Sequence, residues 1–190
     1  MKGAFMALFW GLPVPDATSE RRQTDFRPWP TSRLMTWRIR SLPFSPFASM
    51  FALDAAALAA QGARRMTATQ PHAAPCRVSL TDAAVGETLI LTNRAHIDDP
   101  ASPYRGAGPI FVREGARRAH PEAGDIPDML ARRLLSVRAY DADWMMVEAD
   151  VVDGVRLGDQ LDAWFTRTDV REIHLHTARR GCYMAAVDRG

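Results

Sequence analysis

The chain has almost no lysine, and this absence excludes two kinds of chemistry. Of its 190 residues 24 are lysine or arginine, and the single lysine is Lys2, so the other 23 basic side chains are arginine. Enzymes that form a Schiff base with their substrate use a lysine amine, and the phosphate-binding loop of many nucleotide hydrolases also needs a lysine. A folded domain that begins after Lys2 has neither chemistry.

The patterned part of the sequence also lacks an excess of charge of one sign. The whole chain has a formal net charge of +2, whereas residues 35–190 contain 19 arginines and 19 acidic residues, so the basic excess lies at the beginning of the chain. Proteins that bind nucleic acid usually carry a clustered basic excess. We therefore expect no nucleic-acid partner.

Cysteines and long apolar runs are scarce. Cys76 and Cys182 form no Cys-x-x-Cys pair and no zinc-finger spacing. A disulfide between them stays open, although two free thiols in a reducing cytoplasm fit the sequence better. The longest apolar stretch, residues 3–14, is shorter than the roughly 20 residues that cross a bilayer, so we expect no membrane segment.

The first 34 residues differ from the rest. They contain four prolines and no sustained hydrophobic period, which favours a disordered extension over a folded element. Translation from an early start codon would explain such an extension, with Met35 as the true start. Residues 35–190 have a length typical of one domain.

Alternating and helical patterns in residues 35–190 predict a single α+β domain. Short strands outnumber helices and mostly follow one another, which predicts a mostly antiparallel sheet with three or four short helices. The best helix spans about 156–167, where one apolar face combines Leu157, Leu161, Trp164 and Phe165. Residues 94–108 are rich in Gly, Pro and Asp and are predicted to form a loop.

The most specific candidate site lies in the last two predicted strands, residues 170–176 and 182–187. Alternation places Glu172, His174 and His176 on one face of the first strand. If residues 177–181 close a hairpin, His176 lies opposite Cys182, with Cβ atoms about 5 Å apart. The expectation depends on register, because a slip of one residue turns Cys182 to the other face.

Three interpretations of this patch remain open. An imidazole beside a thiol favours the nucleophilic thiolate, so Cys182 would be the nucleophile and His176 the base. Alternatively, His174, His176 and Cys182 are ligands of the kind that bind zinc or a similar divalent metal. In the third interpretation these side chains have no chemical role.

Two further groups add cysteine and arginine to the candidates. Cys76 precedes Arg77, a neighbouring guanidinium that helps to stabilise a thiolate, and Cys76 is a second candidate nucleophile. Tyr104 and Arg105, with Arg113, flank a Gly-Pro loop and are candidates to clamp a carboxylate or phosphate. The arginine doublets at 64–65, 117–118, 132–133 and 179–180 are interpreted as solvated surface.

Several multi-residue motifs are similar to those of one bacterial family. They are Pro75-Cys76-Arg77-Val78-Ser79-Leu80, Gly86-Glu87, Ser102-Pro103-Tyr104-Arg105, Gly108-Pro109-Ile110-Phe111-Val112-Arg113-Glu114, His174-Leu175-His176-Thr177-Ala178 and Gly181-Cys182-Tyr183. With these motifs the chain from Met35 onward resembles the family catalogued as domain of unknown function (DUF) 1203. The resemblance implies no established activity. It implies that the Cys76, Arg113 and His176/Cys182 motifs belong to the family pattern, although relatives often have Asn where this chain has Thr177.

The sequence therefore predicts a small protein that binds an anionic molecule and uses thiol or imidazole chemistry on it, with Arg77 or Arg113 anchoring the anion. Whether it is an enzyme, and its oligomeric state, stay open. A metal-binding protein and a non-catalytic interaction module are the alternatives.

Overall fold

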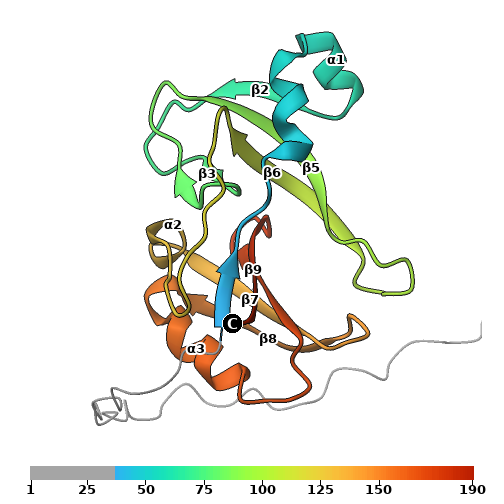
Figure 1. The fold of residues 1–190 in the computed structure, drawn as a ribbon, viewed down its shortest axis with the longest axis vertical. Coiled ribbons are helices and arrows are strands. Elements are labelled where there is room, and N and C mark those ends of the chain that lie inside the picture. Colours follow the sequence, from blue (N-terminus) through green and yellow to red (C-terminus); the bar gives the residue numbers. More distant parts are fainter. Residues whose placement is uncertain (1–36) are drawn as a thin grey trace, which may run out of the picture. The chain divides into compact units, whose positions relative to one another are not determined.

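The structure, a computed structural model, describes residues 37–190, which form two five-stranded sheets and short helices (Figure 1). Sheet A contains β1 (Trp37–Arg40), β7 (Leu134–Tyr140), β8 (Met146–Asp153), β9 (Glu172–Thr177) and β10 (Tyr183–Arg189). Sheet B contains β2 (Arg64–Thr67), β3 (Pro75–Cys76), β4 (Thr81–Asp82), β5 (Thr88–Ile97) and β6 (Gly106–Arg113). The helices are η1 (Ser45–Ala52), α1 (Ala55–Ala60), α2 (Asp128–Ala131) and η2 (Gly154–Arg156), which runs directly into α3 (Leu157–Trp164). The extension predicted over 1–34 and the start at Met35 lie outside the described residues.

Sheet A has the strand order β1-β10-β9-β7-β8, and all of these pairings are antiparallel. Alternation on the central strand β9 directs Ile173 and Leu175 to one side, where they pack with Leu157 and Leu161 of α3. The helix predicted over about 156–167 is therefore confirmed, with bounds Leu157–Trp164 (Figure 1). Its apolar residues pack against this face of the sheet.

Sheet B has the order β2-β5-β6-β3-β4 and is antiparallel except where β3 meets β6. The loop predicted over 94–108 is shorter in the structure, because β5 continues to Ile97 and β6 begins at Gly106. A bulge between Ala95 and Ile97 lets the pairing continue through a stretch with little alternation. The turn residues Asp98-Asp99-Pro100 therefore belong to a shorter connection, which joins β5 to β6.

The second face of β9 is also covered. Tyr183 and Ala186 of β10 pack in one apolar cluster with residues of sheet B, among them Ile90, Ile110 and Val112. The α+β class is confirmed, with four short helical segments in the described residues when η2 and α3 are counted together. The strands form two sheets, not one, because apolar residues on both faces of sheet A require a layer on each side.

In the part of the chain that the structure describes, none of the helices is long and apolar enough to span a membrane.

Gly154 is a point where only a hydrogen side chain fits. A Cβ atom there would clash with the carbonyl oxygen of Leu130 and lie 2.7 Å from that of Ala131. The Gly154 amide also donates to the Arg133 carbonyl (2.8 Å), which links the start of η2 to the residue that precedes β7.

We expect Gly154→Ala to destabilise the fold by about 3 kcal/mol or more, because overpacking against rigid backbone costs 1–3 kcal/mol and sometimes more. Denaturant unfolding measures this free energy. Gly108→Ala is the matched control, since nothing lies within 4 Å of a Cβ at Gly108. Equal unfolding free energies for the two variants would contradict the close packing.

Candidate functional site: an arginine pocket beside Cys182

The register of the last hairpin differs by one residue from the predicted one. His176 pairs with Tyr183, while the Thr177 amide donates to the Cys182 carbonyl (2.9 Å) and the Cys182 amide donates to the Thr177 hydroxyl (3.2 Å). Thr177 thus extends β9 instead of opening the loop. Because side chains alternate, Cys182 does not share the face of His174 and His176, and the predicted joint site does not form.

Cys182 instead lines a cavity of about 480 Å³, which we call the arginine pocket. Its walls come from segments that are far apart in the sequence. They are His72, Ala73, Pro75, Arg77, Phe111, Arg132, Arg133, Leu134, Thr177, Arg179, Arg180 and Cys182. Five of these residues are arginine and none is acidic, so the pocket is positively charged and has an apolar wall.

Arg77 is the buried arginine of the pocket, with only 2% of its surface exposed. Its Nε donates to the Tyr183 carbonyl (2.8 Å) and its Nη1 donates to the Pro75 carbonyl (2.5 Å). Burial lowers the pKa of Arg77 from 12.5 to about 10, while the thiols of Cys182 and Cys76 act in the opposite direction. Arg77 therefore stays charged at neutral pH, and within residues 37–190 it forms no ion pair with a carboxylate.

Arg133 and Arg132 shape another wall through contacts with Asp82. Arg133 binds the Asp82 carboxylate with both terminal nitrogens, at 2.5 and 3.1 Å. Arg132 lies 3.0 Å from Nδ1 of His72, which is 3.3 Å from Asp82. His72 has a φ of +60°, a conformation that non-glycine residues rarely adopt. Such strain at a pocket rim persists only where surrounding contacts hold it, as these do.

Arg179 and Arg180 give the pocket an exposed cationic rim. Both stand in the turn between β9 and β10, and neither pairs with a carboxylate in residues 37–190. Unlike Arg133, whose charge Asp82 offsets, these two guanidinium groups and Arg77 retain their charge for a ligand.

Cys76, the second predicted nucleophile, is fully buried. It has no exposed surface and packs with Val78 and Ile110. Its sulfur accepts a hydrogen bond from the Arg113 amide at 3.3 Å. This position gives Cys76 no access to a dissolved ligand, so the two thiols have different environments.

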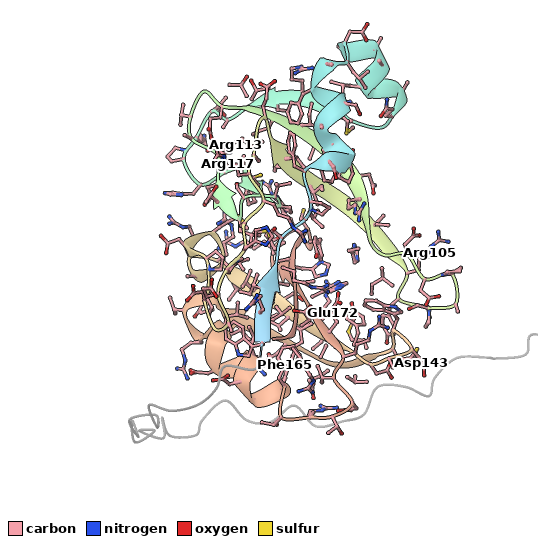
Figure 2. All side chains as sticks on the ribbon, viewed as in Figure 1. Arg105, Arg113, Arg117, Asp143, Phe165 and Glu172 are labelled. Carbon is pink, nitrogen blue, oxygen red and sulfur yellow. The ribbon has the colours of Figure 1, made fainter. Side chains whose placement is uncertain are left out.

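The predicted clamp of Tyr104, Arg105 and Arg113 does not assemble. Arg105 precedes β6 and pairs with Asp98 (2.9 Å), whereas Arg113 ends β6 and pairs with Glu87 (2.7 Å). Eight residues of extended strand separate the two arginines by roughly 26 Å, and Figure 2 shows them at opposite ends of the strand.

The two predicted histidines join a third one that the sequence analysis missed. His96, at the end of β5, has its ring centroid 5.0 Å from that of His176 and 5.9 Å from that of His174. His174 contacts the Glu172 carboxylate (2.8 Å), and His176 contacts the Gly181 carbonyl (2.9 Å). We call His96, His174 and His176 the histidine cluster.

Burial makes two members of the histidine cluster, His176 and His96, poor acceptors of protons. It lowers the pKa of His176 from 6.5 to about 3, and the Arg138 guanidinium and the other two imidazoles act in the same direction. Burial and the charges of His174 and Arg138 lower the pKa of His96 to about 4. Among the described residues, Nε2 of His176 and Nδ1 of His96 and His174 have no hydrogen-bond partner.

Glu172 lies at the edge of this cluster, near the centre of Figure 2. Burial alone would raise its pKa, but the hydrogen bond with His174 and the charges of His174, Arg40 and Arg171 hold the pKa of Glu172 below its ordinary value. The zinc alternative is not supported, because within residues 37–190 no three His, Cys, Asp or Glu side chains are placed to hold a metal ion. This includes the predicted set of His174, His176 and Cys182.

Two arginine doublets belong to the pocket. The sequence predicts solvated surface at 132–133 and 179–180, whereas in the structure all four arginines line the pocket with Arg77. Arg179-Arg180 has no acidic neighbour in its turn, and that lack of local compensation was the available clue.

The fold and the site define an α+β protein with a cationic surface pocket. The family model described as "Protein of unknown function (DUF1203)" matches residues 73–189. The match covers more than half of the chain, so the chain belongs to the DUF1203 family. The matched residues include most of those that line the pocket, among them Arg77, Arg133 and Cys182. Comparisons with curated proteins and with solved structures gave no match.

Because of the histidine cluster, we expect the free energy of unfolding to fall in mild acid. Below pH 6.5 an unfolded chain protonates His176, whereas the folded chain keeps it neutral down to about pH 3. The unfolded state then binds more protons, so the free energy of unfolding falls as the pH drops. The expected slope is about 1.4 kcal/mol per pH unit for each such histidine between pH 6 and pH 4.

Urea unfolding at several pH values measures this slope. His176→Asn keeps a donor for the Gly181 carbonyl but cannot titrate, so its stability should depend less on pH over this range. His120→Asn is the control, because His120 lies outside the cluster. An unchanged slope in His176→Asn would show that the cluster does not cause the acid sensitivity.

Proposed function

We propose that the protein binds a small anionic molecule with an apolar part in the arginine pocket and holds it beside the Cys182 thiol. The observation that carries this proposal is a pocket lined by five arginines and no acidic residue, with buried Arg77 free of any carboxylate partner in residues 37–190. A buried, uncompensated guanidinium is costly unless a counter-anion approaches it.

The dimensions and lining of the pocket support a small organic anion. Its volume of about 480 Å³ falls in the range of roughly 300–1,000 Å³ that is typical of small-molecule sites. Phe111 and Leu134 offer apolar contacts, and the guanidinium groups offer forked donors that match carboxylate or phosphate oxygens. An inorganic anion would leave the apolar contacts unused.

The arginines have different roles in this binding. Arg77 is held by two backbone carbonyls and cannot move far, so it is a fixed anchor. Arg179 and Arg180 are exposed in a turn and can close on the ligand from the solvent side. Electrostatic attraction toward such a cationic mouth also speeds the encounter with anions.

The test uses phenyl phosphate as the probe, titrated into the full chain by calorimetry. We expect saturable binding that is tighter than for inorganic phosphate and weaker at high salt, where screening shortens the reach of the charges. Arg179→Gln/Arg180→Gln should weaken binding about 3- to 10-fold, because an exposed ion pair contributes up to about 1 kcal/mol.

The matched control is Arg94→Gln/Arg117→Gln, which removes the same charge from exposed arginines outside the pocket lining. Arg117 lies on the segment after β6 (Figure 2) and is not one of the residues that line the pocket. Equal losses of affinity in both double variants would point to a non-specific charge effect. No saturable binding by the unmodified protein would refute the proposal.

A further inference from the structure

The arginine pocket contains one reactive group that anion binding alone does not use. Cys182 is a free cysteine, partly exposed, and one of the pocket walls. Its sulfur lies 3.9 Å from the Arg180 carbonyl, a weak contact that leaves the thiol accessible. It is also close enough to Arg77 to oppose the lowering of the Arg77 pKa by burial.

We propose that Cys182 is a site of reversible mixed-disulfide formation with small disulfides that carry carboxylates. The inference rests on the proposed function, since the arginines that would bind an anion also hold the acidic part of such a disulfide. It adds a covalent step and a class of reactant to that function.

The step conserves atoms and electrons. Cys182 loses its proton to solvent, and the thiolate attacks one sulfur of the disulfide. The disulfide bond of the reactant breaks as a bond forms between Sγ of Cys182 and that sulfur. The second half of the reactant leaves as a thiolate with the bonding electron pair and takes up a proton. Cys182 is oxidised, and the leaving sulfur is reduced.

The surroundings of Cys182 favour this reaction with an anionic disulfide. Negative charge is spread over the reacting sulfurs during attack, and guanidinium groups nearby stabilise it more than they stabilise the protonated thiol of Cys182. Arg179 and Arg180 flank the approach from solvent, so an acidic reactant is attracted and a cationic one is repelled.

The position of the second thiol decides what the product is. The chain has two cysteines, and Cys76 is fully buried in the core of sheet B. It therefore cannot displace the bound half and form an internal disulfide. The mixed disulfide on Cys182 persists until a thiol from solution removes it, which makes the modification reversible without turnover by the protein.

The experiment compares three disulfides of similar size on the reduced full chain: anionic 3,3′-dithiodipropionate, neutral bis(2-hydroxyethyl) disulfide and cationic cystamine. Intact mass spectrometry measures the rate at which each reagent modifies the protein. Dividing this rate by the rate at which the same reagent reacts with 2-mercaptoethanol removes intrinsic differences in reactivity between the reagents. We expect the normalised rate to be about tenfold or more higher for the anion than for the cation at low salt. In 1 M salt, where the screening length is about 3 Å, the difference should largely disappear.

Variants assign the effect to the pocket. Cys182→Ser should give no adduct, and peptide mapping of the unmodified sequence should place the adduct on Cys182. Arg179→Gln/Arg180→Gln should slow the anionic reagent several-fold more than the neutral one, whereas Arg94→Gln/Arg117→Gln should slow neither.

Normalised rates that do not depend on reagent charge, or an adduct on Cys76, would overturn the inference. Phenyl phosphate binding separates the two proposals. If the unmodified protein binds phenyl phosphate and the exchange is insensitive to charge, only the inference fails. If binding is absent too, the proposed function fails with it.

Discussion

The arrangement of the described residues depends on the hydrogen bonds of one buried guanidinium. Arg77 follows β3 of sheet B, and its side chain donates to the Tyr183 carbonyl on β10 of sheet A. Its own backbone pairs with Phe111 and Leu42. These bonds satisfy buried carbonyls of both sheets, and a buried acceptor without a donor costs about 1–3 kcal/mol. The same residue that joins the sheets also supplies the inner charge of the pocket.

The hairpin between β9 and β10 separates two environments. On one face His176, whose pKa is lowered by burial, contacts the Gly181 carbonyl within the histidine cluster. Beyond Thr177 the same hairpin carries Arg179, Arg180 and Cys182 into an open cationic pocket. Gly181 has a φ of +70°, which lets its carbonyl point back at His176. The titratable groups of the two environments differ as a consequence: imidazoles inside and guanidinium groups outside.

Local patterns in the sequence were sufficient to predict the class of fold and to recognise the family. The spacing of Leu157, Leu161 and Trp164 predicted α3, and alternation correctly grouped Glu172, His174 and His176 on one face. The one-residue error at Cys182 came from the turn, because the hydroxyl of Thr177 accepts the Cys182 amide and this residue therefore continues the strand. A pattern of alternating residues contains no information on that bond.

The pocket itself could not be derived from the sequence, because its walls are brought together only by long-range pairing. His72 and Arg132 are 60 positions apart and in contact, and Arg77 meets Tyr183 across 106 positions. Neither pair has a local signature. Arg77 was nevertheless identified as a candidate anion anchor from its place beside Cys76, and the structure shows it buried in a pocket with the other cysteine.

The near absence of lysine has a consequence for how the pocket responds to its surroundings. Arginine keeps its proton even where burial lowers its pKa, as at Arg77, whereas a lysine in the same place would begin to lose its charge closer to neutral pH. The five guanidinium groups therefore present a nearly constant positive potential across the pH range in which cells live. A change of affinity with pH over that range therefore does not come from the guanidinium groups of the pocket.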